Sequence, residues 1–435
     1  MLKEFKEHII NNFPFLMESK SLIAISGGVD SVVLAYLCKE IGLDVALAHC
    51  NFNLRGKESN EDQRFIEALG IKLNIETFVQ EFDTQNFAKV NKISIQMAAR
   101  DLRYGWFDEL CKQLHFDYLL TAHHADDNLE TFLINLSRGS GLDGLTGIPE
   151  INENIVRPLL LFTKDEIVAF AQEMNIGWRE DESNTSTKYL RNKLRHEVIP
   201  ILKGINSQML NNFTETIDHL KGSKQIIEDR IDEVSDEIVD VKPNGIHLNI
   251  EVLKSQNNPK AYLYELLKDY GFTEWNDVAD LLNSQSGTQV FSKEWRLLKD
   301  RDYLIVSELL EEEEYEIFID KDQDVVSLPN GTLEIELVKS LGKSSNQIIY
   351  ADLEKLKFPL AIRKKRDGDF FYPLGMIGKK KMSKYFKDEK FSLLDKENTL
   401  LLCSGDDIVW VIGHRADNRF KVSKSTKDIL RLKIK

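Results

Sequence analysis

The stretch ISGGVDSV, residues 25–32, follows the apolar run SLIA and precedes the helix-like run VLAYLCKEIG. Two adjacent glycines allow the backbone to turn tightly and to approach a ligand closely. Where a strand ends and a helix begins at such a turn, the free N–H groups and the positive end of the helix dipole face outward. Glycines alone also fit an ordinary turn, but the whole string in this context predicts a site for phosphate.

Asp30 repels phosphate, so its place in an anion-binding loop needs a reason. A carboxylate there suits the binding of a Mg²⁺ ion that contacts the phosphates, or a catalytic role toward a substrate. Capping of the helix N-terminus is the structural alternative. No Walker A string occurs in the chain. Gly139, Gly141 and Gly144 match G-x-G-x-x-G, but they follow a helical pattern and not a strand, which argues against a dinucleotide site.

Apolar runs alternate with helical patterns from residue 21 to residue 140. The expected strands are 21–26, 44–50, 72–79 and 117–123, and the expected helices are 30–42, 60–71, 94–114 and 126–138. This order predicts a parallel sheet with the ends of the strands, and the loops after them, at one edge. The fold class is α/β, with an N-terminal parallel-sheet domain (1–204), a helical middle domain (205–312) and a small mixed α/β C-terminal domain (313–435).

A second cluster, TAHHADDNLET (121–131), follows the strand that contains Tyr118 to Leu120 and belongs to the same sheet edge. Asp127 and Glu130 are three residues apart at a helix start, so they share one helix face. Paired carboxylates near phosphates suit Mg²⁺ binding or proton transfer. Asp126 is a candidate N-cap. The two histidines, 123 and 124, fit polar contacts to a nucleotide better than a zinc site.

Net charge is −14 over 435 residues, which by itself argues against a nucleic-acid partner. The basic residues are unevenly distributed, however. Residues 360–390 hold ten Lys or Arg and four Asp or Glu, which indicates a local surface for a polyanion or a solvated charged face. In the N-terminal part, loop arginines and the helical pair Arg191 and Arg195 suit phosphate or simple salt bridges.

The four cysteines are widely spaced and form no C-x-x-C pair, which argues against disulfides and a cysteine zinc site and fits a reducing cytoplasm. The N-terminal segment 1–17 has helical spacing without a long apolar core, as an amphipathic helix does and a signal peptide does not. No apolar run is long enough to predict a membrane span.

SGGVDS resembles the PP-loop of the N-type ATP pyrophosphatases, which split ATP to AMP and pyrophosphate. Further strings occur in the order of the tRNA(Ile)-lysidine synthetase family: HCNFNLRG, AARDLRY, TAHHADDNLETFL, RGSGLDGLTGI, RPLL and YLRNKLRHEVIP, then IRKKRDGDFFYPLGM and KKKMSKYFKD. The resemblance covers most of residues 20–200 and 360–415. Asn128 stands where this family leads us to expect glutamine, and segment 392–402 lacks an expected arginine and proline.

The resemblance implies a ligase that forms a C–N bond between free L-lysine and the wobble cytidine of a tRNA(Ile) with a CAU anticodon, using ATP and Mg²⁺. It leaves the oligomeric state open, with a homodimer among the alternatives. With the motifs above, it implies ATP binding by Ser26, Gly27, Gly28, Val29, Asp30, Ser31, His49, Arg100 and His123. It implies catalysis by Asp30, Asp127, Glu130 and Arg191, and Mg²⁺ binding by Asp30 and Asp127. It implies tRNA binding by Arg55, Arg195, Arg363, Lys364, Lys365, Arg366, Lys379, Lys380 and Lys381.

Three other functions share some of these features. A tRNA thiolase would use the same phosphate loop, but relatives of that kind carry paired or catalytic cysteines. A small-molecule amidating ligase would need no late basic region. A non-catalytic RNA-binding scaffold would not need the intact carboxylates Asp30, Asp127 and Glu130. ATP–pyrophosphate exchange that depends on the tRNA distinguishes these alternatives.

Overall fold

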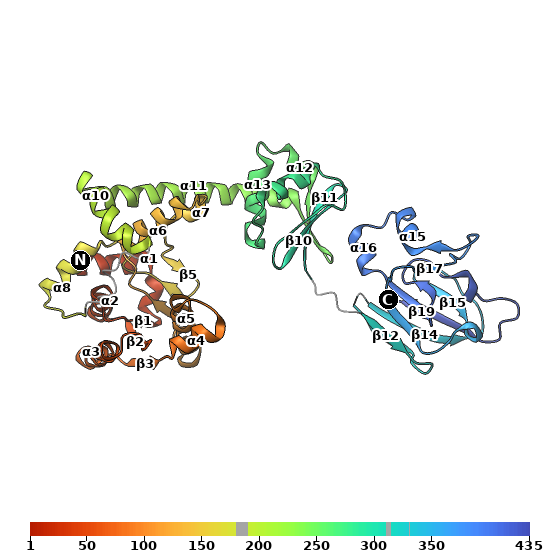
Figure 1. Ribbon diagram of the computed structural model, residues 1–435, viewed down its shortest axis with the longest axis horizontal. Coiled ribbons are helices and arrows are strands. Elements are labelled where there is room, and N and C mark those ends of the chain that lie inside the picture. The colour runs from red at the N-terminus through yellow and green to blue at the C-terminus, as the bar shows by residue number, and fades with distance from the viewer. Residues whose placement is uncertain (180–189, 310–314, 330) are drawn as a thin grey trace. The chain divides into compact units, whose positions relative to one another are not determined.

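The computed structural model describes residues 1–179, 190–309, 315–329 and 331–435. The chain forms two compact units, Met1–Glu228 and Asp229–Lys435, coloured red to green and green to blue in Figure 1. Helix α11, Met209–Ile238, runs across the boundary between them. The division into three domains stays a prediction. Within the described residues, no helix combines the length and the apolar composition that a bilayer crossing demands.

The first unit contains a six-stranded sheet in the order β3-β2-β1-β4-β6-β5. Its strands are β1 (Lys20–Ala24), β2 (Asp44–Asn51), β3 (Thr77–Glu81), β4 (Tyr118–Leu120), β5 (Ile151–Asn152) and β6 (Ile155–Val156). All neighbours pair in parallel except β5 with β6. The predicted parallel sheet is therefore confirmed, and the loops that follow β1, β4 and β6 lie at one edge.

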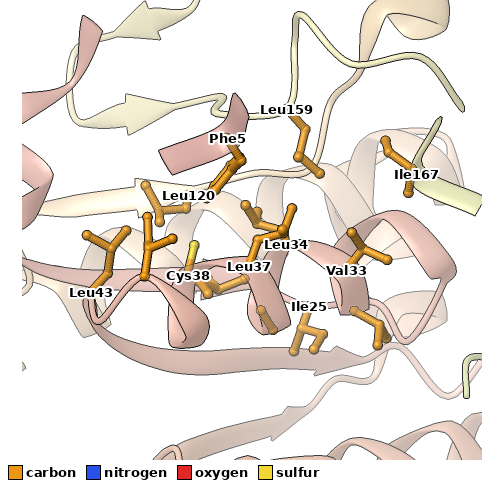
Figure 2. Close-up of a cluster of buried hydrophobic side chains, with 14 of the residues drawn as sticks. Phe5, Ile25, Val33, Leu34, Leu37, Cys38, Leu43, Leu120, Leu159 and Ile167 are labelled. Atoms are coloured by element: carbon orange, nitrogen blue, oxygen red, sulfur yellow. The ribbon is translucent and has the colours of Figure 1, made fainter. Parts of the chain in front are cut away.

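Helices cover both faces of this sheet. They are α1 (Leu2–Asn12), α2 (Val29–Glu40), α3 (Lys57–Leu73), α4 (Thr84–Asn91), α5 (Ile95–Leu114), α6 (Ala125–Ser137), α7 (Leu142–Leu145) and α8 (Lys164–Glu173). Figure 2 shows Phe5 of α1, Leu34 and Leu37 of α2 and Ile167 of α8 gathered in one buried cluster. On the other face, α5 packs against β1, β2 and β4. Since both faces are covered, Leu22 and Ile23 of β1 are both fully buried.

The expected strand 72–79 was placed too early. Helix α3 continues to Leu73 and ends at Asn74, whose φ of 53° is left-handed, so β3 begins only at Thr77. Asparagine tolerates this conformation better than most residues and is a common end of a helix. Helix α4 and the short strands β5 and β6 were not predicted, because each offers too few residues for a periodic pattern.

The middle region carries the predicted helices and also a five-stranded antiparallel sheet that the prediction omitted. The helices are α12 (Ile250–Ser255), α13 (Pro259–Leu267) and α14 (Trp275–Asp280), next to α11. The sheet has the order β7-β8-β11-β10-β9 and consists of β7 (Val239–Lys242), β8 (Gly245–Asn249), β9 (Gln289–Phe291), β10 (Trp295–Asp300) and β11 (Tyr303–Glu308). Helices and sheet share one apolar core.

The last region is mainly sheet. One four-stranded sheet is formed by β12 (Glu316–Ile319), β16 (Leu360–Lys364), β19 (Leu400–Ser404) and β20 (Asp407–Val411). The other is formed by β13 (Val325–Leu328), β14 (Gly331–Val338), β21 (Ile429–Ile434) and β15 (Ile348–Asp352). One core joins the two sheets. A small hairpin, β17 (Phe370–Phe371) with β18 (Lys380–Lys381), precedes α15 (Met382–Asp388) and α16 (Leu393–Asn398).

Candidate functional site

The loop after β1 has the geometry that its sequence predicts. Gly27 has a φ of +91°, which residues with a side chain rarely adopt, and Gly28 is the N-cap of α2. The Ser31 hydroxyl donates to the Gly28 carbonyl at 3.0 Å and accepts from the Ser26 amide at 3.2 Å. The two serines thus hold the turn in shape, with Val29 as the first residue of the helix whose N-terminus faces the loop.

Asp30 lies in the first turn of α2 and is held by a residue that the sequence did not indicate. Lys164, the first residue of α8, places its Nζ 2.7 Å from Oδ1 and 2.8 Å from Oδ2 of Asp30. The backbone amide of Lys164 donates to Asp126 at 2.8 Å. Asp126 also accepts from Lys203 at 2.5 Å. Asp126 is therefore not the N-cap of α6, a position that His124 occupies.

Asp127 and Glu130 project from α6 toward two arginines. Arg191 Nε lies 2.7 Å from Glu130 Oε2, and Arg195 Nε lies 2.5 Å from Glu130 Oε1. Asp127 Oδ1 accepts from the same two guanidinium groups at 3.3 and 3.0 Å. Glu130 is only 1% exposed, so these ion pairs compensate a charge that burial alone would disfavour.

The two arginines lie four residues apart, a spacing that puts both on one helix face, and they stand at a local irregularity. They lie on α9 (Leu190–Lys193) and on the π-helical turn η3 (Leu194–Val198), which leads into α10 (Ile199–Ile205). A π-turn widens the spacing along a helix and is frequent at functional sites. The sequence predicted Arg191 as catalytic and Arg195 as a tRNA contact, and the structure brings both into one cluster with Asp127 and Glu130.

The carboxylates of Asp30 and Asp127 both approach the Nε2 atom of His124. His124 Nε2 is 3.8 Å from Asp30 Oδ1 and 3.4 Å from Asp127 Oδ2. Two carboxylates that approach a common point fit a Mg²⁺ ion completed by phosphate oxygens and water. Among the described residues, no group of three or more side chains forms a metal site without such help.

The histidines of the site are buried to different degrees. His49 is buried, and its Nδ1 lies 3.0 Å from the Ile25 carbonyl, so it contacts the backbone just before the phosphate loop. Burial lowers the pKa of His123 to about 4; Asp127 opposes this effect, whereas Arg157 and Arg191 reinforce it. His123 is therefore neutral at pH 7 and suits a polar contact to an uncharged group.

Some predicted residues lie away from this cluster. Arg55 pairs with Asp62 at 2.8 Å, and Arg100 is exposed on α5 with its guanidinium over the Tyr104 ring. Arg363 is 5% exposed and forms two hydrogen bonds with Asp369, at 2.8 and 2.9 Å. This ion pair fixes the turn after β16, and the guanidinium is not presented to solvent.

The remaining basic residues of the late region lie on the surface or at its edge. Exposed side chains are Lys364, Arg366, Lys379 and Lys381, whereas Lys365 and Lys380 are half-buried. Lys380 pairs with Asp388 at 2.8 Å. A cavity of about 430 Å³ lies here, lined among others by Phe370, Ile377 and Lys379. An aromatic ring beside lysines is typical of nucleic-acid surfaces.

All four cysteines lie among the described residues and are free thiols. Burial raises the pKa of Cys50 to about 12 and that of Cys111 and Cys403 to about 11, and it raises the pKa of Cys38 further. A thiol with so high a pKa is a poor nucleophile at neutral pH. These cysteines are therefore unsuited to the chemistry of a thiolase.

Comparisons with known proteins relate this chain to a family. Residues 1–202 match a family model described as a PP-loop domain, residues 241–309 a TilS substrate binding domain, and residues 360–434 a TilS substrate C-terminal domain. The tRNA(Ile)-lysidine synthase of Parabacteroides distasonis is 39% identical over 97% of both chains. That of Bacteroides thetaiotaomicron is 38% identical over 99% of this chain and 97% of its own.

A solved structure, the U34-tRNA thiolase NcsA from Methanococcus maripaludis, is similar with a TM-score of 0.41 and 18% identity. The match covers 50% of this chain and 79% of the thiolase.

Proposed function

The chain belongs to the tRNA(Ile)-lysidine synthase family, whose members are PP-loop ligases that modify tRNA, and from this premise we propose the course of its reaction. The protein joins free L-lysine to C2 of the wobble cytidine, position 34, of a tRNA(Ile) with a CAU anticodon. ATP is converted to AMP and pyrophosphate. The product, lysidine, changes the codon read from AUG to AUA and the tRNA identity from methionine to isoleucine.

The reaction proceeds in two steps. First, the O2 atom of the cytosine attacks the α-phosphorus of ATP, an O–P bond forms, and pyrophosphate leaves. Second, the ε-amine of lysine attacks C2, the C–O bond to the adenylate breaks, and AMP leaves. Adenylation is needed because an oxygen bound to phosphorus is a far better leaving group than the carbonyl oxygen of cytosine.

The observation that carries this proposal is the meeting of three carboxylates with a phosphate-type loop at one sheet edge. Asp30 follows the loop after β1, and Asp127 and Glu130 follow β4, the neighbouring strand. The loop and the α2 N-terminus suit the phosphates of ATP. A Mg²⁺ ion bound by Asp30 and Asp127 would stabilise negative charge on the departing pyrophosphate. Lys164 would then give up at least one of its two contacts with Asp30.

A carboxylate must also accept the proton of the attacking amine, because lysine in solution has a pKa near 10.4. Both oxygens of Glu130 are held by arginines. Asp127 has one oxygen, Oδ2, that contacts no arginine of the described chain. Although burial acts to raise the pKa of Asp127, the charges of His124, Arg191, His123 and Arg195 lower it below its usual range. The lowered pKa keeps Asp127 ionised at neutral pH, and because its Oδ2 contacts no arginine of the described chain, we assign the proton to this atom.

The tRNA would be held by basic side chains of the C-terminal region: the exposed Lys364, Arg366, Lys379 and Lys381 and the half-buried Lys365 and Lys380. Lysines and arginines that neutralise phosphates supply most of the affinity for nucleic acid. We leave Arg363 out of this surface, because its guanidinium is buried against Asp369. Arg195 is assigned to the carboxylate cluster rather than to tRNA, because it pairs with Glu130.

The test is ATP–pyrophosphate exchange with the purified full chain. We expect exchange with tRNA(Ile) carrying the CAU anticodon, little exchange with tRNA(Met) of the same anticodon, and none without tRNA. Radioactive lysine should then appear in the tRNA. Exchange that proceeds equally without tRNA would instead indicate a ligase that acts on a small molecule.

A further inference from the structure

Arg157 is a buried cation that neither the motifs nor the cluster above assigns. It is the first residue after β6 and is 9% exposed. Nη1 donates to the Pro149 carbonyl at 2.7 Å, whereas Nε is buried with no hydrogen-bond partner among the described residues. Across the parts of the chain that the structure describes, no carboxylate lies within 4.0 Å of this guanidinium. An arginine in this state is unusual, because buried charges are normally paired.

The surroundings of Arg157 are cationic and aromatic rather than acidic. Burial lowers the pKa of Arg157; Tyr104 opposes this effect, and Arg100 adds to it. Arg100 itself lies over the Tyr104 ring, with its Cζ 5.0 Å from the ring centre. The cation near Arg157 is therefore bound to an aromatic ring and not to an acid, and no acidic side chain of residues 1–179 or 190–309 is paired with either guanidinium group. An anionic ligand would supply the missing charge.

Arg157 also lies at the edge of the sheet where the other candidate residues lie. Val156 of β6 pairs with Leu120 of β4, and the Thr121 amide donates to the Val156 carbonyl at 3.0 Å. His123, two residues further, is influenced by Asp127 on one side and by Arg157 on the other. The charges after β6 and at the start of α6 therefore both act on His123, whose pKa of about 4 leaves it neutral at pH 7.

The phosphates of ATP have a separate place. The phosphate-type loop follows β1, and β4 lies between β1 and β6. Neighbouring strands are about 4.8 Å apart, so Arg157 is displaced by roughly 10 Å across the sheet from that loop. The backbone of a tRNA is also a poor match, since a side chain that is 9% exposed is less accessible to a polymer than to a small ligand. A carboxylate on a small molecule fits best.

We propose that Arg157 binds the α-carboxylate of the free lysine substrate and so orients its side chain toward the carboxylates of α6. This inference rests on the proposed function, because it assigns the lysine pocket of that same reaction. An arginine holds a carboxylate through two parallel hydrogen bonds, and the Nη2 atom of Arg157 donates none to the described residues. The four methylene groups of lysine then carry the ε-amine away from Arg157, toward the adenylated base.

The experiment compares L-lysine with L-lysinamide, in which a neutral amide replaces the carboxylate. In Arg157→Gln we expect the KM for L-lysine to rise at least tenfold, while the KM for lysinamide changes less than twofold. The tRNA-dependent exchange, which needs no lysine, should remain within twofold of the wild type. Arg64→Gln, which changes an exposed arginine of α3, is the matched control and should alter none of these values.

An equal rise for both substrates would overturn the proposal, because it would indicate a merely structural arginine. A loss of exchange would overturn it too, because the bound anion would then be a phosphate of ATP or tRNA. Arg157→Lys keeps the positive charge but cannot form two parallel hydrogen bonds, so it should give an intermediate KM for L-lysine. This variant covers the case that Arg157→Gln does not fold. Exchange and lysine incorporation by the wild-type protein are measured first, so a failure of the proposed function is seen separately.

Discussion

At the scale of single residues, the site consists of carboxylates, and each of them pairs with a cationic side chain from a distant part of the chain. Asp30 pairs with Lys164, Asp126 with Lys203, and Glu130 with Arg191 and Arg195. Such pairs hold the carboxylates in place. Under the proposed function, Mg²⁺ and the substrates would compete with these internal cations for the carboxylates.

Asp127→Asn should separate the two steps of the reaction. The amide cannot accept the proton of lysine, so we expect lysine transfer to fall by about 100-fold or more. Adenylation needs no such acceptor but uses the Mg²⁺ that Asp30 and Asp127 would hold, so tRNA-dependent exchange should fall clearly less than lysine transfer. Asp165→Asn, at a side chain that is 88% exposed, is the control and should leave both steps unchanged. If Asp127→Asn lowers exchange as much as lysine transfer, Asp127 acts on ATP or its metal alone, and the proton acceptor is another group.

His123 should make the fold sensitive to mild acid. Its pKa is about 4 in the folded chain and about 6.5 when unfolded, so the unfolded state binds the proton first as the pH falls. Stability is therefore complete above pH 6.5 and is lost between pH 6.5 and 4, by at most about 3 kcal/mol. His123→Gln should reduce this loss. Urea unfolding at pH 7 and pH 5 measures it, and equal losses in both proteins would contradict the prediction.

His8 and His49 should retain part of the acid sensitivity in that variant. Burial lowers the pKa of both, so they also disfavour the folded state as the pH falls through the same range. The comparison between the variant and the wild type, and not the slope of either alone, therefore reports on His123.

At the scale of elements, each chemical group lies where a regular element begins or ends. The phosphate-type loop joins β1 to α2, and Lys164 is the first residue of α8 after its N-cap Thr163. The cap is stabilised by a capping box: the Thr163 hydroxyl accepts from the Glu166 amide at 3.2 Å, and Glu166 accepts from the Thr163 amide at 2.8 Å. Strong caps fix the first side chain of a helix, and so they fix Lys164 against Asp30.

Gly27→Ala tests how strictly the loop needs its backbone shape. A φ of +91° strains any residue with a Cβ, so we expect a loss of about 1–2 kcal/mol in the free energy of unfolding and a marked loss of exchange. Gly105→Ala is the matched control. Gly105 lies inside α5 with open space around it, so alanine there should stabilise the protein by about 0.5–1 kcal/mol. Unchanged exchange in Gly27→Ala would show that the loop tolerates another shape.

At the scale of the whole molecule, an acidic chain carries a locally basic surface in its C-terminal region. The net charge is −14, yet exposed lysines gather around the β17–β18 hairpin and α15. Lys379 lies 5.0 Å from the centre of the Phe370 ring, and the side chain of Ile377 is fully exposed. The local charge, and not the average, therefore decides which partner this surface attracts.

The double variant Lys379→Ala, Lys381→Ala should weaken tRNA binding mainly at low salt. Each lysine that neutralises a phosphate contributes about 0.7–0.9 to the slope of log affinity against log salt, so the slope should be shallower in the variant. Filter binding at several salt concentrations measures this slope. Lys339→Ala, at an exposed lysine after β14, should leave it unchanged. A slope that is equal in the double variant and in the wild type would remove these lysines from the tRNA surface.

The residues of the phosphate loop and the carboxylates Asp30, Asp127 and Glu130 were found from local patterns, because a strand, a turn and a helix start leave a signal within a few neighbours. Lys164 and Lys203 left no such signal, and the string RPLL, which begins at Arg157, gave that residue no role. Each is an ordinary charged residue in its own segment. Its role depends on whether a residue far away in the sequence pairs with it. The omitted middle sheet has the same cause, since its strands are short and lie between helices.

The sequence by itself determined the parallel α/β order, the phosphate-type loop with Gly27 at its turn, and the helix face that carries Asp127 and Glu130. These features depend on neighbours within one or two turns of chain, where periodicity and backbone freedom decide. Only the tertiary structure decided that Arg363 is buried against Asp369, that Arg191 and Arg195 hold the same carboxylate, and that Arg157 is buried without an acid from the described residues beside it. Ion pairing and burial depend on which segments the fold brings together, and no local pattern encodes that.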